Sequence, residues 1–238
     1  MTRFARGLDG CPAGWVVVTL HDGQVADVEV VAHVDEVLDG DAAPGAAIGI
    51  DMPIGLTDTA NRAADVAARR LLPGRASSIF NAPPRTVVDG FVDGSVADHA
   101  AASARSVAVT GKGISQQAWR LVPKIAELDR VVAAGAALLE VHPEVAFALL
   151  VGEPLPRKRS WAGLTTRRGL LERCGIIVPE RFPGDADCAA DDVLDAAICA
   201  WVADGIATGE PPLTVPDQAT EFDGDRPIVI HARRPPTV

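Results

Sequence analysis

The sequence contains no tyrosine, and aromatic residues make up only 4% of its 238 residues. Hydrophobic residues still account for 48%, so alanine and valine must supply most of the packing in the core. No stretch approaches the roughly 18 consecutive apolar residues that a membrane span requires, and we expect no membrane partner. Residues 1–6 lead directly into a predicted strand and do not resemble a signal peptide, so we expect a cytoplasmic protein.

Three further sequence features are absent: paired cysteines, the Walker phosphate-binding motif and internal repeats. The four cysteines include no CxxC pair, which argues against a zinc site or a disulfide framework and favours reduced thiols. Lys112 lies between two glycines, as in a phosphate-binding loop, but the Walker pattern is missing. No internal repeat is present, which argues against an actin-like ATPase, a class that duplicates its domain.

Charge is unevenly distributed along the chain. The net charge of −10 argues against a general nucleic-acid coat protein, because phosphate contacts need Lys and Arg. Residues 7–60 hold ten acids and no Lys or Arg, and residues 180–225 are again acidic with a single Arg. Basic residues gather between these ends. If the ends meet in space, this distribution suits a metal cluster beside a phosphate-binding surface; ordinary solvated charge is the alternative.

Five apolar segments predict the strands of one sheet. The first three have short links and indicate an antiparallel meander, whereas the last two are wholly apolar, as expected when both faces are covered. We therefore predict an α/β protein with a mixed sheet of three antiparallel and two parallel strands. It forms one domain, 1–238, with a helical insertion at about 53–135. The predicted strands are 4–8, 15–20, 25–32, 46–50 and 136–141.

Three of the predicted strands end at an acidic residue. Asp9 follows the first strand, Asp51 follows the fourth, and Glu140 lies at the end of the fifth. If these strands are parallel neighbours, the acids share the carboxyl edge of the sheet, where active sites of open α/β sheets lie. Aspartates at strand ends are also common in turns, which is the simpler interpretation of each one alone.

A late segment, 191–202, has the apolar spacing of a helix and places carboxylates along one border of its buried face. Asp191 and Asp195 are about 40° apart around the axis, and Asp192 and Asp195 are neighbours at i and i+3. A favourable interaction with the helix dipole explains an Asp in the first turn, but not Asp195 further along. We expect these carboxylates to bind metal; an acidic rim in solvent is the alternative.

Carboxylates that converge need a neutralising partner, because four or more would repel one another by several kcal/mol. Mg²⁺ and Mn²⁺ are hard, oxygen-seeking ions and are the expected cofactors. Two such ions about 4 Å apart can activate water and stabilise the leaving oxygen of a phosphodiester. The sequence does not decide between one ion and two.

Six motifs in order resemble the family called domain of unknown function 429, over residues 9–201. This resemblance implies a ribonuclease-H-like fold and a nuclease-like activity. Within that superfamily the arrangement looks like the Holliday-junction resolvases, which implies metal ligands at Asp9, Asp51, Asp192 and Asp195. Glu140 and the residues that follow it have no clear counterpart there. The motifs are DGCPAGW from Asp9, IDMPIGL from Ile50, SSIFNAP from Ser77, GISQQAW from Gly113, EVHPE from Glu140 and DDVLDA from Asp191.

Other polar residues are candidates for catalysis or substrate binding. His142 precedes a proline and is either catalytic or a cap at the strand end, and Glu144 fits the first turn of a helix. The candidate catalytic residues are Asp9, Asp51, Glu140, His142, Asp192 and Asp195. The candidate substrate-binding residues are Arg75, Ser77, Lys112, Gln116, Lys124, Lys158 and Arg167.

Three functions fit these features. The first is a metal-dependent phosphodiesterase or nuclease acting on nucleic acid. The second is a hydrolase or binding protein for a small nucleotide-like or phosphorylated metabolite, which suits the acidic composition and the bulky insertion. The third is a non-catalytic interaction module with a degenerate site, against which the intact carboxylates argue.

Overall fold

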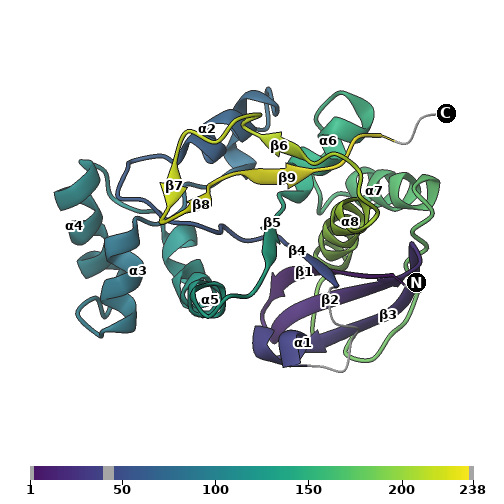
Figure 1. Cartoon of the computed structure of the whole chain (residues 1–238), viewed down its shortest axis with the longest axis horizontal. Helices are drawn as coiled ribbons and strands as arrows, with labels where there is room; N and C mark the ends of the chain where they lie inside the picture. The colour runs from purple at the N-terminus through teal and green to yellow at the C-terminus, as the bar shows by residue number, and fades with distance from the viewer. Residues whose placement is uncertain (1–2, 40–45, 236–238) are drawn as a thin grey trace. The chain divides into compact units, whose positions relative to one another are not determined.

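The computed structural model describes residues 3–39 and 46–235. It combines a mixed sheet with helices, as expected of an α/β protein (Figure 1). The elements are β1 (Phe4–Cys11), β2 (Gly14–His21), β3 (Gln24–Val31), α1 (Val34–Asp39), β4 (Ala47–Ile50), α2 (Ala63–Arg70), the 3₁₀ helix η1 (Ala76–Ser78), α3 (Arg85–Val92), α4 (His99–Thr110), α5 (Gln116–Ala133), β5 (Leu138–Glu140), α6 (Pro143–Val151), α7 (Trp161–Arg173), α8 (Ala190–Ala207), β6 (Leu213–Val215), β7 (Phe222–Asp223), β8 (Arg226–Pro227) and β9 (Ile230–Ala232).

These elements belong to two compact units. The first unit contains the described residues of Met1–Met52, Ala136–Thr214 and Ile230–Val238. The second unit contains Pro53–Gly135 and Val215–Val229. The segment expected to be a helical insertion therefore forms the second unit together with a later segment that carries β7 and β8.

The first unit is built on a mixed five-stranded sheet in the order β3-β2-β1-β4-β5 (Figure 1). The strands β1, β2 and β3 pair antiparallel, which confirms the predicted meander. The strand β4 runs parallel to both β1 and β5, which confirms that the first, fourth and fifth strands are parallel neighbours. Their carboxyl ends therefore lie at one edge of the sheet.

The first strand is longer than predicted. Asp9 is not in a turn after the strand but within β1, where it pairs with Val16 of β2. Pairing continues to Cys11 opposite Gly14, so only Pro12 and Ala13 reverse the chain. The glycines and the proline suggested a long turn, but a two-residue hairpin loop needs only these positions.

Helix α8 packs directly against the sheet, and two glycines make its close approach possible. Gly7 of β1 and Gly49 of β4 pair side by side in the parallel register. A Cβ atom added at Gly7 would lie 1.9 Å from the carbonyl oxygen of Ala196, and one at Gly49 would lie 2.5 Å from that of Cys199. The helix backbone therefore lies against a part of the sheet without side chains, and α8 is almost wholly buried as a result.

The second unit is mainly helical, and one of its helices was not predicted from the sequence. Helix α3 was not predicted, because it directly follows a loop rich in helix-breaking residues. Pro84 precedes its first residue, and the fixed φ of a proline is compatible with a helix start. Helix α5 contains Pro123 and nevertheless runs unbroken through it. The buried Arg62 and Asp65 form an ion pair of 2.6 Å beside α2.

Helix α7 of the first unit begins at Trp161. The side chain of Ser160 caps it by accepting a hydrogen bond from the backbone N–H of Gly163. Among the described helices, none combines the length and apolar character that crossing a membrane would require.

Candidate metal centre

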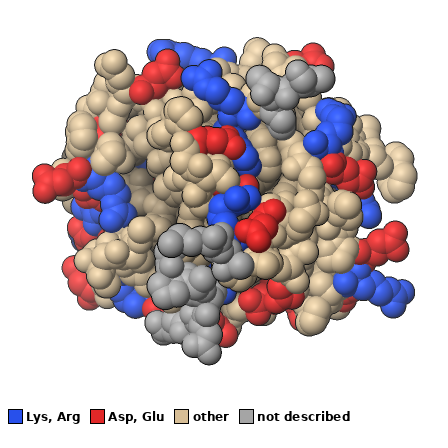
Figure 2. All heavy atoms as spheres, turned by 45° about the vertical axis from the view of Figure 1, so that its right-hand side comes forward, with Lys and Arg blue, Asp and Glu red and all other residues tan. Residues whose placement is uncertain are grey.

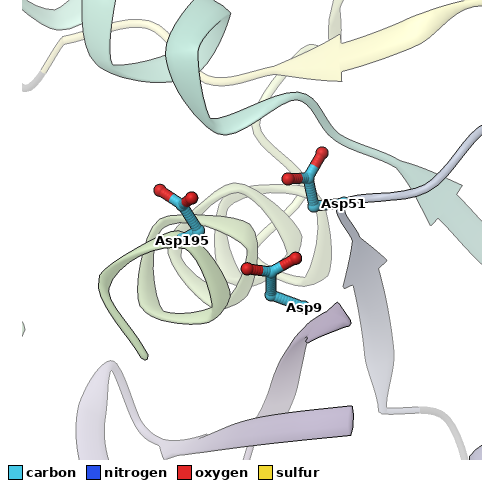
Figure 3. A group of neighbouring side chains, drawn as sticks. All are labelled: Asp9, Asp51 and Asp195. Atoms are coloured by element: carbon cyan, nitrogen blue, oxygen red, sulfur yellow. The ribbon is translucent and has the colours of Figure 1, made fainter. Parts of the chain in front are cut away.

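Three aspartates from three different elements meet at the carboxyl edge of the sheet. Asp9 lies near the end of β1, Asp51 follows β4, and Asp195 lies on α8 (Figure 3). Each offers one carboxylate oxygen, and these three oxygens all lie within 4.8 Å of one another. In the part of the chain that the structure describes, this is the one group of three or more such side chains with the spacing of a metal site.

The local fold explains why these side chains converge. Leu8 pairs with Ile50 in the parallel register, so the next residue of each strand, Asp9 and Asp51, lies at the same edge. The backbone N–H of Asp51 donates to the carbonyl of Leu8 at 2.9 Å and fixes this alignment. Gly7 admits the backbone of α8 at Ala196, which brings the preceding Asp195 to the same edge.

Burial and mutual repulsion disfavour the charged forms of these carboxyls. Asp9 and Asp195 are 7% and 2% exposed, and Asp51 is half-buried. Burial, followed by repulsion from Asp51 and Asp195, raises the pKa of Asp9 well above its usual value. Burial also raises the pKa of Asp51 to about 6 and that of Asp195 to about 7. Binding of a cation or of protons would therefore stabilise the site near neutral pH.

Lys158 supplies part of that positive charge. Its ammonium Nζ lies 2.6 Å from Oδ2 of Asp195 and 3.5 Å from Oδ2 of Asp191. Burial disfavours the charged ammonium, but attraction to Asp195, Asp9 and Asp51 outweighs this effect and raises the pKa of Lys158. One ammonium cannot balance three carboxylates. Lys158 was predicted to bind substrate, and the structure places it within the carboxylate centre itself.

The remaining oxygen of Asp195 has no partner among the described residues. Its Oδ1 is buried and accepts no hydrogen bond, while Oδ2 accepts one from Lys158. A buried carboxylate oxygen left unpaired costs free energy, on the order of 1–3 kcal/mol or more for a charged group. This cost would be removed by a ligand that binds at Oδ1.

The donor set fits Mg²⁺ or Mn²⁺. These ions prefer carboxylate oxygens and water, and the three aspartates offer only oxygen. Ligand oxygens of octahedral Mg²⁺ are about 2.9 Å apart when adjacent and about 4.2 Å apart when opposite, so the three oxygens, all within 4.8 Å of one another, are close enough to move onto one ion. Asp9, Asp51 and Asp195 would hold such an ion, with water completing its coordination.

A comparison with protein families covers most of the chain, including all three of these aspartates. The family model described as "Protein of unknown function (DUF429)" matches residues 7–221. The chain belongs to the DUF429 family. No curated protein and no solved structure matches it.

Asp192, predicted as a metal ligand of this DUF429 chain, makes a hydrogen bond at the start of its own helix. Its Oδ2 accepts a hydrogen bond of 3.2 Å from the backbone N–H of Ala189, so it caps the first turn of α8. It is not in the group of three, although its charge contributes to the raised pKa values of Asp9 and Asp51. Asp191 pairs with Lys158 and Arg159.

Two further candidates lie outside the group of three. Glu140, the last residue of β5, is buried and pairs with Ile50 in the parallel register. Its backbone carbonyl accepts a hydrogen bond from Nδ1 of His231, if that nitrogen carries the proton. His142 is half-buried and precedes α6 as its N-cap residue. The structure does not bring either side chain into the set that could hold a metal.

Arg167, predicted to bind substrate, is enclosed by the DUF429 fold. Its side chain is fully buried, and Nη2 donates to Oε1 of Glu144 at 2.7 Å. Its Nη1 donates to the backbone carbonyls of Pro156 and Gly163. A guanidinium used in this way joins α6 to α7 and does not reach a ligand from solvent, so we withdraw this residue from the substrate-binding set.

The other predicted substrate-binding residues belong to the second unit. Ser77 and Lys112 line a cavity there. Gln116 lies within 3.0 Å of Nδ1 of His99 through its Nε2. The carbonyl of Arg75 accepts a hydrogen bond from the hydroxyl of Ser78. Lys124 lies on α5, outside the lining of that cavity.

The raised pKa values predict how stability depends on pH. Folding favours the protonated forms of Asp51 and Asp195, so this stabilisation is full below about pH 4 and is lost as pH rises through about 6 to 7. A tenfold change in proton affinity corresponds to about 1.4 kcal/mol, so the loss amounts to a few kcal/mol. In chelator, we expect the Tm to fall between pH 5 and pH 8. Added Mg²⁺ should raise it more at pH 8 than at pH 5.

The variant Asp195→Asn provides the control for this pH dependence. His231 has a lowered pKa because of burial and acts in the opposite direction, but it is present in both proteins. The difference in Tm between variant and wild type therefore reports the contribution of Asp195, including its repulsion of the other two carboxylates. The prediction is contradicted if the wild-type Tm in chelator does not change between pH 5 and pH 8, or if it rises over this range as much as the Tm of the variant does.

Proposed function

We propose that this chain is a divalent-metal-dependent hydrolase of phosphodiester bonds, a nuclease-like enzyme. The observation that carries the proposal is the convergence of three carboxylate oxygens within 4.8 Å at one sheet edge, two of them from buried residues and one from the half-buried Asp51. Buried like charges at this spacing destabilise the fold unless a cation or protons neutralise them. Proteins commonly keep such destabilising clusters of charge at functional sites, where the charged groups bind a ligand or take part in catalysis.

The chemistry follows from the donor set. When bound, Mg²⁺ or Mn²⁺ supplies an activated water and stabilises charge on a phosphodiester oxygen. Asp9, Asp51 and Asp195 would hold the ion, and the hydrogen bond from Lys158 fixes the orientation of the Asp195 carboxylate. Arg157 and Arg159, on either side of Lys158, are exposed, and although Arg159 pairs with Asp191, both guanidinium groups face solvent where they can bind the phosphates of a substrate.

We also propose a ribonuclease-H-like fold for the first unit. The mixed sheet supports it, because an antiparallel meander is followed by two parallel strands, with β1 next to β4. The placement of acids on β1, after β4 and on a late helix supports it as well. The four free cysteines support a cytoplasmic location.

A small phosphorylated substrate is the second candidate. Basic and acidic side chains are intermixed on the face shown in Figure 2, without the broad basic field of a duplex-binding protein. Cleavage of oligonucleotides compared with cleavage of free nucleotides and sugar phosphates, in Mn²⁺, separates the two candidates. Turnover of oligonucleotides alone supports a nuclease, and turnover of the small molecules alone supports the second candidate.

Binding of Mn²⁺ tests the metal centre directly. Calorimetry at pH 8 is expected to show saturable Mn²⁺ binding by the wild type and none by Asp9→Asn at the same millimolar concentrations. Asp187→Asn, which removes an exposed carboxylate shortly before α8, should bind as the wild type does. No binding by the wild type would reject the centre and favour a non-catalytic interaction module.

A further inference from the structure

The second unit contains a cavity of its own. It has a volume of 560 Å³ and is lined by the end of α2, the loop 77–84, α4 and the start of α5. Cavities that hold small molecules and cofactors are typically about 300–1,000 Å³. This cavity therefore has room for a molecule of about nucleotide size.

The charge of the lining is opposite to that of the chain. No Asp or Glu lines the cavity, whereas Arg69 and Lys112 do, in a protein with 32 acids and 22 basic residues. Hydroxyl and amide groups surround these two cations, and the ring of Phe80 adds an apolar surface. Such a lining attracts an anion and supplies hydrogen bonds to a polar body.

The loop that carries Lys112 is held in place. The backbone carbonyl of Lys112 accepts hydrogen bonds from the hydroxyls of Ser106, at 2.6 Å, and Thr110, at 3.0 Å. Ser106 is only 2% exposed, so this anchor is buried. A Cβ at Gly113 would lie 2.4 Å from Oγ of Ser103, so the loop also packs closely on α4. The backbone is fixed while the Lys112 side chain is exposed and makes no ion pair with a described residue.

Arg69, the second cation of the lining, is also held in place. Its guanidinium donates to the carbonyl of Ile79, at 3.1 Å from Nη2, and to Oδ1 of Asn81. These acceptors are neutral, and no described carboxylate pairs with Arg69, so its positive charge is not balanced within the described part of the unit. A fixed, unbalanced guanidinium is suited to binding phosphate.

We propose that this cavity binds a small phosphorylated metabolite of about nucleotide size. Lys112 and Arg69 bind the phosphate, the hydroxyl and amide groups bind the polar body, and Phe80 packs against an apolar or aromatic part. This site is formed by residues between 60 and 117 and uses none of the three aspartates of the metal centre.

Calorimetry with ADP in chelator tests the site without a contribution from the metal centre. The wild type is expected to bind ADP in the micromolar range. Lys112→Gln should weaken binding by about tenfold or more, because a charge-assisted hydrogen bond is lost, and Lys112→Arg should restore it. Arg70→Gln removes a neighbouring exposed charge on α2 outside the lining and should change affinity by less than about twofold.

Further probes define the ligand class. Adenosine should bind far more weakly than ADP, because it lacks the phosphate. Ribose 5-phosphate, which lacks the base, serves as the second phosphorylated probe and shows whether the apolar part of the ligand contributes to affinity. Asp195→Asn should bind as the wild type does, so loss of the metal centre leaves this site testable. The proposal is overturned if Lys112→Gln binds like the wild type, or if neither phosphorylated probe binds at millimolar concentration.

Discussion

Replacing Asp195 with asparagine is expected to lower metal-dependent cleavage by more than about a hundredfold, since even a residue that only supports a metal ligand commonly contributes 10- to 100-fold. Asparagine keeps the size of the side chain but replaces a negative oxygen with a neutral amide. The amide keeps one oxygen that can accept from Lys158, but an NH₂ group then takes the place of the buried Oδ1, and Lys158 loses its nearest anionic partner. Initial rates on the preferred substrate in Mn²⁺ measure the effect.

Stability distinguishes this loss from simple unfolding. In chelator at pH 8, Asp195→Asn should be at least as stable as the wild type, because one of three repelling carboxylates is gone. Asp187→Asn should keep both activity and Tm, since that side chain is exposed. Equal Mn²⁺-dependent rates for Asp195→Asn and the wild type would remove Asp195 from the centre.

Replacing Gly7 with alanine is expected to lower the free energy of unfolding by at least about 3 kcal/mol, at the upper end of overpacking effects. The new Cβ would lie 1.9 Å from the carbonyl oxygen of Ala196 and 2.1 Å from the backbone nitrogen of Ala200. Both are backbone atoms of a buried helix, so no side chain can rotate away and α8 itself must move. Denaturant unfolding of the purified variant measures the change.

Gly169→Ala is the matched control for this substitution. Gly169 lies on α7, and an added Cβ there would meet nothing within 4 Å. Alanine is the better helix former by about 1 kcal/mol, so this variant should be as stable as the wild type or slightly more so. If the two variants unfold at the same denaturant concentration, close contact between α8 and the sheet does not limit stability.

The sheet and two of its acids could be predicted from the sequence because they follow short-range rules. Apolar strands bounded by turn residues identified β1 to β5, and the position of Asp9 and Asp51 at strand ends placed them at one edge. The helical period of 191–202 identified α8 and singled out Asp195. Each of these signals lies within about a dozen residues, the range over which periodicity is informative.

The remaining features depend on contacts between distant segments. Nothing near Lys158 in the sequence shows that its ammonium contacts Asp195, and nothing near Arg167 shows that it is buried against Glu144. Asp192 is three residues before Asp195, a spacing that suits two metal ligands on one helix, but a carboxylate in the first turn of a helix can also accept a hydrogen bond from a backbone N–H there. The pairing of Gly7 with Gly49 was the one signal that more attention to strand glycines could have found.

The position of α8 in the sequence has a consequence for synthesis of the protein. More than half of the chain separates Asp51 from Asp195, so a ribosome completes β1 to β5 well before it makes the helix that carries the third carboxylate. A nascent or prematurely ended chain that stops before α8 has only two of the three aspartates. Partial products would therefore lack the complete group of three aspartates.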